Sequence, residues 1–168
     1  MKKPAAVLWA LALLAGALSA REIRVCTLET NRGTIVFEMY DRAAPRTVGR
    51  ISELANSGFY SGIVFHRVVP EFVVQAGDPG GTGEGGSGKN LGAEFSHLHY
   101  IRGSVGMARA EDIDSADSQF FICITDQPHL DGRYTLFGQV TEGLAVVDRI
   151  RQGDKILSMK VETVERQD

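Results

Sequence analysis

The sequence predicts a mainly β fold, a closed eight-stranded antiparallel β-barrel capped by two α-helices. Eight short segments carry the apolar and β-branched residues of strands, whereas only two segments have the apolar spacing of helices. Parallel strands would need a crossover helix after each strand, and two helices are too few for that. An antiparallel sheet that closes on itself leaves no bare edge, so a barrel is the expected arrangement.

The predicted strands begin with a hairpin. Asn31-Arg32-Gly33 separates two strand-like runs and has the residue types of a tight turn. The later strands are short, and neither an internal repeat nor a linker interrupts their succession. The eight predicted strands span residues 23–30, 34–40, 63–69, 72–76, 103–109, 119–125, 134–140 and 156–164.

Two segments predict helices. Residues 41–58 contain Pro45, which favours a first helical turn, and close with Asn56-Ser57-Gly58, which favours a helix end. The second predicted helix covers residues 142–152 and is followed by Gly153. The residues expected to face the core are Val48, Ile51, Leu54 and Ala55 in the first helix and Leu144, Val147 and Ile150 in the second.

Residues 1–20 have the composition of a signal peptide. Lys2 and Lys3 precede an apolar run over residues 5–17, and small residues then lead to Ala20. The run is shorter than the roughly 20 residues that cross a bilayer comfortably, so a retained membrane anchor is the weaker alternative. Cleavage after Ala20 would leave 148 residues, enough for one domain with a substantial core.

The charge balance restricts the expected partners. Without Lys2 and Lys3 the chain keeps 16 basic residues against 21 acidic ones, a net charge of −5. A mildly acidic chain argues against nucleic acid as a partner, and against membrane association after cleavage. Nothing in the sequence indicates assembly beyond a monomer.

The two cysteines allow two interpretations. An exported protein meets oxidising conditions, under which Cys26 and Cys123 would form a disulfide if their Cα atoms approach within about 7 Å. Otherwise they are buried thiols that pack as small apolar side chains. Neither belongs to a Cys-x-x-Cys pair, which argues against a redox enzyme.

Eight of the 19 glycines fall between Gly77 and Gly92. Gly81 to Gly86 matches the G-x-G-x-x-G pattern, but a phosphate-binding loop needs a helix directly after it, and none is expected here. A surface loop whose backbone approaches a ligand closely is the better interpretation. The acidic run at residues 111–114 lacks the pattern of a calcium loop, and His97 and His99 lack a third ligand, so no metal or cofactor is expected.

The segment at residues 65–78, FHRVVPEFVVQAGD, carries the most chemical information. At a period of two residues, Phe65, Arg67 and Val69 share one face, which places a permanent cation among apolar neighbours. Phe72 and Gln75 follow on the next run. A cation and an amide beside apolar surface suit an uncharged ligand with hydrogen-bonding groups, such as a peptide backbone with an apolar side chain.

Together with SVGMARA at 104–110, SQFFI at 118–122 and LDGRYTLFG at 130–138, this segment closely resembles the cyclophilins. The resemblance extends over nearly all of residues 21–168, and these motifs are long and specific. It implies an eight-stranded barrel with two helices, in agreement with the strand count above. The short form and the signal peptide resemble exported bacterial members, so the mature chain is expected in the periplasm or outside the cell.

The resemblance implies that Arg67 is the catalytic residue. The substrate-binding residues that it implies are Phe72, Val73, Phe121 and Leu130 around a proline ring, His66, Gln75 and Gln119 along the groove, Ala108 and Arg109 on a strand edge that pairs with the substrate backbone, and His129 and Tyr134. His129 stands where eukaryotic members have tryptophan, and Tyr134 where many have histidine. Weak binding of the inhibitor cyclosporin is therefore expected.

The implied activity is peptidyl-prolyl cis–trans isomerisation of unfolded or folding polypeptides that contain proline, in support of the folding of exported proteins. Rotation about an X–Pro bond faces a barrier of roughly 18–20 kcal/mol, and a guanidinium that binds the twisted amide would lower it. The chemistry requires no cofactor and no metal. The alternatives are an inactive module that binds proline-containing segments and a barrel that carries small ligands.

Overall fold

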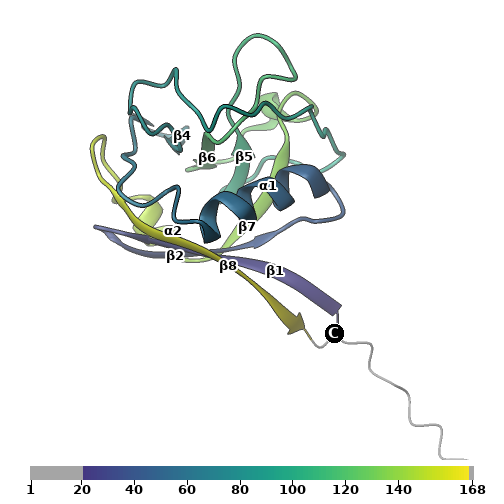
Figure 1. The fold of residues 1–168 in the computed structure, drawn as a ribbon, viewed down its shortest axis with the longest axis horizontal. Helices are drawn as coiled ribbons and strands as arrows, with labels where there is room; N and C mark the ends of the chain where they lie inside the picture. The colour runs from purple at the N-terminus through teal and green to yellow at the C-terminus, as the bar shows by residue number, and fades with distance from the viewer. Residues whose placement is uncertain (1–20, 167–168) are drawn as a thin grey trace, which may run out of the picture.

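The computed structural model describes residues 21–166 and has one eight-stranded sheet with two α-helices (Figure 1). The predicted signal peptide, residues 1–20, lies outside the described residues. All neighbouring strands pair antiparallel, as predicted, in the order β3-β4-β6-β5-β7-β2-β1-β8. The strands are β1 (Arg21–Thr30), β2 (Gly33–Met39), β3 (Arg67–Val69), β4 (Val73–Ala76), β5 (Ser104–Met107), β6 (Phe120–Cys123), β7 (Leu136–Glu142) and β8 (Ile156–Arg166).

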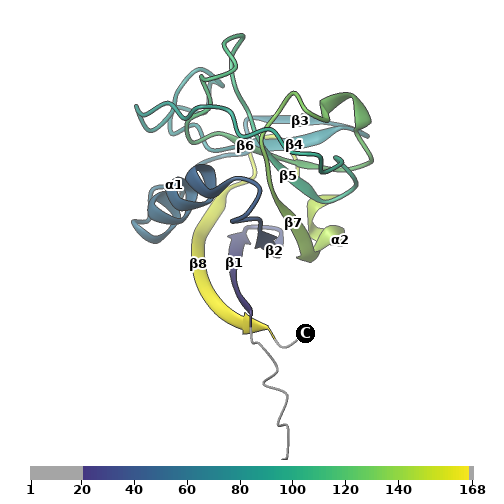
Figure 2. The same cartoon turned by 90° about the vertical axis from the view of Figure 1, so that its right-hand side faces the viewer.

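The prediction of a closed barrel is not confirmed, because no ladder joins the edge strands β3 and β8. The segments that precede these two strands do meet. Val64 and Lys155 form an isolated bridge, and the N–H of Ile156 donates to the carbonyl of Ile63 over 2.9 Å. Beyond this contact, β1 and β8 continue side by side as a long curved pair (Figure 2).

Both helices are shorter than predicted. α1 (Pro45–Asn56) begins at the proline, because the residue before a proline is disfavoured in the helical region, and Ala44 has φ −143°. α2 (Leu144–Val147) ends early because the next N–H groups, of Arg149 and Ile150, bond to carbonyls three residues back. A 3₁₀-helix, η1 (Pro128–Leu130), was not predicted. α1 packs against β8, and α2 against β2.

The helix stripes are largely as predicted. The four core-facing residues of α1 are buried, as are Val147 and Ile150, whereas Leu144 is only partly buried. Alternation along β6 divides the interior into two clusters. Phe120 and Ile122 belong to the main core, while Phe121 and Cys123 belong to a smaller cluster on the other face.

Both cysteines are free and buried. Cys26 lies in the main core and Cys123 in the smaller cluster, so the alternative of two packed thiols describes the structure. Burial raises the pKa of the Cys123 thiol to about 12, and it raises that of Cys26 further. Neither thiol is therefore ionised at ordinary pH.

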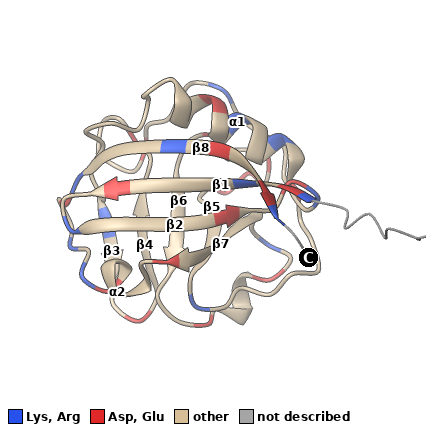
Figure 3. Ribbon diagram, turned by 90° about the horizontal axis from the view of Figure 1, so that it is seen from below, with Lys and Arg blue, Asp and Glu red and all other residues tan. Residues whose placement is uncertain are grey.

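The outer face formed by β1, β2 and β8 carries charges of both signs rather than a patch of one sign (Figure 3). Two ion pairs lie here, between Arg166 and Glu38 at 2.8 Å and between Arg24 and Asp41 at 3.3 Å. Among residues 21–166, no helix has the length and apolar character required to span a membrane.

A carboxylate distant in sequence caps the N-terminus of α1. Ala44 offers no capping side chain, but Glu94 accepts hydrogen bonds from the N–H groups of Arg46 (3.0 Å) and Thr47 (2.9 Å) and from the Thr47 hydroxyl (2.8 Å). Burial alone would raise the pKa of Glu94, but these hydrogen bonds outweigh it and lower the pKa. The loop before β5 is thereby fixed to the helix.

We expect Glu94→Ala to lower the free energy of unfolding by about 1–3 kcal/mol, because it leaves the first N–H groups of α1 without their acceptor. Urea unfolding followed by circular dichroism would measure this. The matched control is Glu53→Ala, since Glu53 belongs to α1 but is exposed and pairs only with Arg50. The control should cost less than about 1 kcal/mol, and equal losses in the two variants would contradict the capping role of Glu94.

Candidate active site

The site begins with a row of residues that face one another across neighbouring strands. Arg67 on β3 is opposite Gln75 on β4, and Gln75 is opposite Phe121 on β6. Phe121 is in turn opposite Gly106 on β5. Directly opposed residues of an antiparallel sheet project from the same face. A cation, an amide and an aromatic ring are therefore adjacent on one surface.

A pocket of about 170 Å³ opens beside this row. Nine of the twelve residues proposed from the sequence line it: Arg67, Phe72, Val73, Gln75, Ala108, Arg109, Phe121, Leu130 and Tyr134. The other three, His66, Gln119 and His129, lie outside its lining and contact the residues or the loop around it.

Arg67 is exposed at the edge of the pocket. Its guanidinium carbon lies 5.5 Å from the centre of the Phe72 ring, and its Nη1 donates to Oε1 of Gln75 over 3.2 Å. The expectation that Phe65 shares the environment of Arg67 is wrong. Phe65 lies outside β3 and is fully buried in the main core, because the regular strand begins only at Arg67.

The turn between β3 and β4 brings Phe72 next to Arg67. Glu71, in this turn, has a positive φ of 58°, a conformation that costs free energy for a residue with a Cβ. Its carbonyl accepts hydrogen bonds from the Thr125 hydroxyl (2.6 Å) and from Nε2 of Gln127 (3.0 Å). These two contacts hold the turn against the residues that follow β6.

Aromatic side chains form the floor and sides of the pocket. The Phe121 ring meets Tyr134 edge to face, with centroids 6.0 Å apart. The Arg109 guanidinium lies over the Tyr134 ring at 4.7 Å, and it donates to the carbonyl of Arg133. His129 contacts the pocket indirectly, since its ring lies 5.6 Å from that of Phe72.

The Arg109 side chain makes several contacts beside the pocket. In addition to its contact with the Tyr134 ring and its hydrogen bond to Arg133, the guanidinium donates to the carbonyl of Ala110 over 2.9 Å. The neighbouring residue Ala108 has its N–H bonded to the carbonyl of Gln119 (3.0 Å). A substrate backbone can use that N–H only by displacing this bond.

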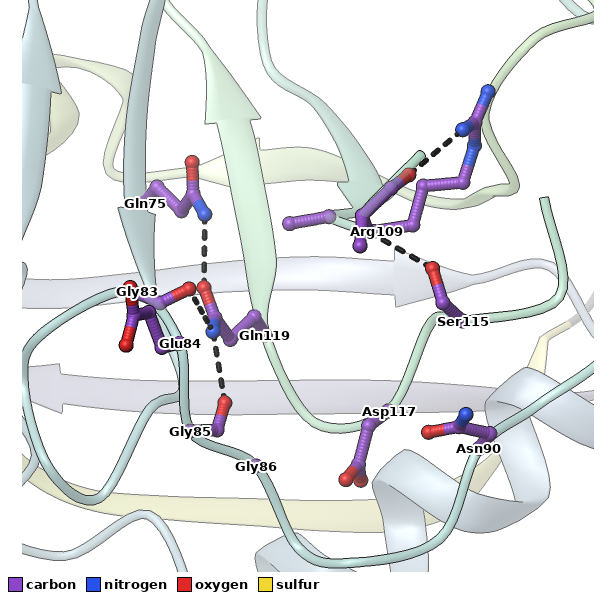
Figure 4. Close-up of a pocket in the computed structure, with 12 residues that line it drawn as sticks. Gln75, Gly83, Glu84, Gly85, Gly86, Asn90, Arg109, Ser115, Asp117 and Gln119 are labelled. Atoms are coloured by element: carbon purple, nitrogen blue, oxygen red, sulfur yellow. Dashed lines mark hydrogen bonds between the residues drawn. The ribbon is translucent and has the colours of Figure 1, made fainter. Parts of the chain in front are cut away.

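A second hollow of about 400 Å³ adjoins the pocket, between the glycine loop at residues 83–86 and residues 108–119 (Figure 4). Gln75, Ala108 and Arg109 line both hollows. The eight clustered glycines signalled a loop that approaches a ligand closely, but no pattern in the sequence connected it with residues 115–117.

Two glutamines connect the glycine loop to Arg67. Gln75 accepts from Arg67 and donates through Nε2 to Oε1 of Gln119 over 2.9 Å. Gln119 then donates to the carbonyls of Gly83 (2.9 Å) and Gly85 (2.8 Å), as Figure 4 shows. The side chain that orients Arg67 is thus itself oriented by the loop.

A buried carboxylate, which the sequence did not single out, organises the glycine loop. Asp78 accepts hydrogen bonds from the N–H groups of Gly80 (2.8 Å), Thr82 (2.8 Å) and Gly83 (2.7 Å). Burial alone would raise the pKa of Asp78, but these donors outweigh it and lower the pKa to about 2. Asp117 holds the following residues by accepting from the N–H of Gly88 over 2.8 Å.

His66 supports this loop instead of lining a hollow. A Cβ added at Gly83 would lie 3.5 Å from Nε2 of His66, and both ring nitrogens are buried without a hydrogen-bond partner among the described residues. Burial lowers the pKa of His66, the Asp78 charge raises it, and the Arg67 charge lowers it again, with a net decrease. His66 is therefore a neutral packing partner of the loop at neutral pH.

The predicted absence of a metal site remains a prediction, although residues 21–166 contain no cluster of three or more histidine, cysteine or acidic side chains suited to a metal ion. His99 is exposed, and its Nδ1 lies 2.6 Å from a carboxylate oxygen of Asp131.

Known proteins are similar to this chain in sequence and in architecture. Residues 25–166 match the family described as cyclophilin type peptidyl-prolyl cis-trans isomerase. The chain belongs to this family. The resemblance found in the sequence is confirmed, and the chain is a peptidyl-prolyl cis–trans isomerase.

The relatives cover most of the chain. A peptidyl-prolyl cis-trans isomerase of Helicobacter pylori is 47% identical over 137 residues, which are 79% of this chain and 83% of the relative. One from Synechococcus elongatus is 46% identical over 138 residues, or 81% and 94% of the two chains. A crystal structure of a Cryptosporidium parvum cyclophilin has a TM-score of 0.78 at 27% identity, covering 83% of this chain and 98% of that one. The same protein was crystallised in the presence of the dipeptide Ala-Pro.

We expect the Asp78 carboxylate to contribute about 2 kcal/mol to folding above pH 4 and to lose this contribution as the pH falls from 4 towards 2. The sign follows from the pKa, which is lower in the folded chain than the ordinary value of 3.8, so protonation favours unfolding. Urea unfolding at pH 7, 4, 3 and 2.5 would measure the change. Asp78→Asn should be less stable at pH 7 and should show a shallower decline below pH 4.

The matched control is Asp41→Asn, because Asp41 is only partly buried and, among residues 21–166, its one ion pair is with Arg24. It should follow the wild-type curve closely. A decline in Asp78→Asn as steep as that of the wild type would show that another group causes the loss of stability at acid pH.

Proposed function

We propose that Arg67 is the catalytic residue and that the 170 Å³ pocket receives the proline ring of the substrate. The observation that supports this most is the row of Arg67, Gln75 and Phe121 beside the pocket. A proline ring against Phe121, Leu130 and Phe72 would present its amide nitrogen to the side on which the guanidinium lies. Tyr134 and Val73 complete the apolar lining.

The proposed mechanism is preferential binding of the twisted amide. In the planar isomers the nitrogen lone pair is delocalised into the carbonyl, and at the transition state it returns to nitrogen. An N–H of Arg67 directed at that nitrogen would donate a hydrogen bond that neither planar isomer accepts. An acceleration of 10⁵-fold would need about 7 kcal/mol of such preference. The hydrogen bond from Arg67 to Gln75 restricts the guanidinium before the substrate arrives.

We expect Arg67→Ala to lower kcat by roughly 10²–10³-fold, the usual effect of removing one donor to a transition state. Because Arg67 is exposed, the variant should fold normally. Exchange NMR or a protease-coupled assay on a short X–Pro peptide would measure the rate. Arg67→Lys should recover only part of it, since lysine keeps the charge but loses the planar arrangement of donors.

The matched control is Arg24→Ala, which removes an arginine from the outer face and should keep the wild-type rate. If Arg67→Ala isomerised the peptide as fast as the wild type, the assignment of Arg67 would be wrong. Binding of the peptide without acceleration in every variant, including the wild type, would instead favour an inactive binding module.

We further propose that residues 1–20 are a signal peptide and that the mature isomerase domain, residues 21–168, assists the folding of exported proteins in the periplasm or outside the cell. The basic start, the apolar run and the small residues before Arg21 support this. We also propose weak cyclosporin binding and a monomeric state. His129 has no indole N–H and less flat area than the tryptophan of eukaryotic members, which supports the first of these.

Export can be tested by expressing the full chain in a bacterium and measuring the intact mass of the protein in the periplasmic fraction. We expect a species that begins at Arg21. Leu11→Arg combined with Leu13→Arg interrupts the apolar run and should leave the precursor uncleaved in the cell. The control is Lys155→Ala, far from the leader in sequence. Full-length protein in the cytoplasmic fraction of the wild type would contradict export.

A further inference from the structure

A tyrosine lies directly behind the floor of the pocket. Tyr100 comes from the loop before β5 and is only 1% exposed. Its ring is stacked against that of Phe121, with centroids 5.7 Å apart and an angle of 29° between the planes. Tyr100 does not line the pocket, so it can influence a bound proline ring only through Phe121.

The stacking depends on a glycine. Gly106 is opposite Phe121 in the β5–β6 ladder, and a Cβ at this position would lie 2.6 Å from Cζ of Phe121. The same Cβ would lie closer still to the Tyr100 hydroxyl. Gly106 has no positive φ, so the backbone does not demand glycine here. A glycine inside a strand weakens it, and the close approach of the two rings is the physical reason for it.

The backbone of Tyr100 is attached to the side of the pocket. Its N–H donates to Oδ1 of Asp131 over 2.8 Å, and its carbonyl accepts from the N–H of Gln127 over 2.8 Å. Gln127 and Asp131 flank η1, which carries the pocket residue Leu130. Tyr100 thus supports the Phe121 ring at the floor of the pocket. Its backbone is also hydrogen-bonded to both ends of η1, which forms one side of the pocket.

The Tyr100 hydroxyl is buried and has no hydrogen-bond partner among the described residues. Burial without a partner costs free energy that phenylalanine would not lose. The ring, rather than the hydroxyl, is therefore what the pocket requires from this position. Tyr100→Phe keeps the ring and removes the unpaired hydroxyl. This variant therefore separates the contribution of the ring from that of the hydroxyl.

We propose that Tyr100 is a positioning residue: its ring fixes the orientation of Phe121, through the space that Gly106 leaves open, and so sets the shape of the proline pocket. The inference rests on the proposed assignment of this pocket to the proline ring. Without the ring of Tyr100, Phe121 would gain room to rotate and the floor would no longer match a proline. The pocket holds the ring in planar and twisted states alike, so the loss should appear mainly in KM.

The test compares Tyr100→Leu, Tyr100→Phe and Gly106→Ala on a short X–Pro peptide. We expect Tyr100→Leu and Gly106→Ala to raise KM at least tenfold with kcat changed less than threefold. Tyr100→Phe should keep both constants within twofold of the wild type. The aromatic NMR signals of Phe121 should shift or broaden in the first two variants and stay near their wild-type positions in Tyr100→Phe.

The matched control is Phe37→Leu, which removes a buried aromatic ring from the main core, where Phe37 packs against Phe137. It should lower stability without changing KM. If Tyr100→Leu does not fold, Gly106→Ala carries the test, since it leaves Tyr100 in place. An unchanged KM in a folded Tyr100→Leu or Gly106→Ala would overturn the proposal. Wild-type rates in Arg67→Ala would instead refute the assignment of the catalytic residue, so the two failures are distinct.

Discussion

The register of four short strands is the constraint on which the site depends. Arg67, Gln75, Phe121 and Gly106 face one another across β3, β4, β6 and β5, and each is useful only because the next lies beside it. A slip of one residue between any two of these strands would turn part of the row to the opposite face of the sheet. Burial of alternate β6 residues fixes the register. Phe120 and Ile122 fill the main core, while Phe121 faces the pocket.

Carboxylates supply hydrogen-bond acceptors where the chain has little regular secondary structure. The strands around the pocket have three or four residues, and the segments between β4 and β6 are mostly loop. Loop N–H groups that leave water need acceptors. Asp78 and Asp117 provide them for the glycine loop, and Glu94 does so for the start of α1. Asp117 and Glu94 join segments that are distant in sequence, and Asp78 accepts from N–H groups within its own loop, so the loops keep one shape beside the pocket.

Much of the fold could be predicted because its signals are local. Alternating apolar residues, the turn at Asn31-Arg32-Gly33 and the proline of α1 act over a few positions. The role of Glu94 could not be predicted, since its donors lie 47 and 48 residues away and meet it only in the folded chain. The donors of Asp78 lie within five residues of it, but the glycine pattern does not indicate which side chain accepts from the loop N–H groups. The length of α2 and the open edge between β3 and β8 depend on competing hydrogen bonds. The site residues could be predicted from the motifs that resemble the cyclophilins. Tyr100 lies outside those motifs, and its role follows only from its contacts in the folded chain.

The arrangement around Arg67 favours an enzyme over a passive binding surface. An exposed arginine loses considerable side-chain entropy when it is held in one orientation. Here the guanidinium is bonded to Gln75, which is bonded to Gln119, which is bonded to the loop organised by Asp78. A surface that only collected apolar proline rings would gain nothing from this chain of bonds, because the aromatic pocket already supplies that affinity. Orientation matters when the donor must meet a nitrogen lone pair that is localised on nitrogen only in the twisted amide.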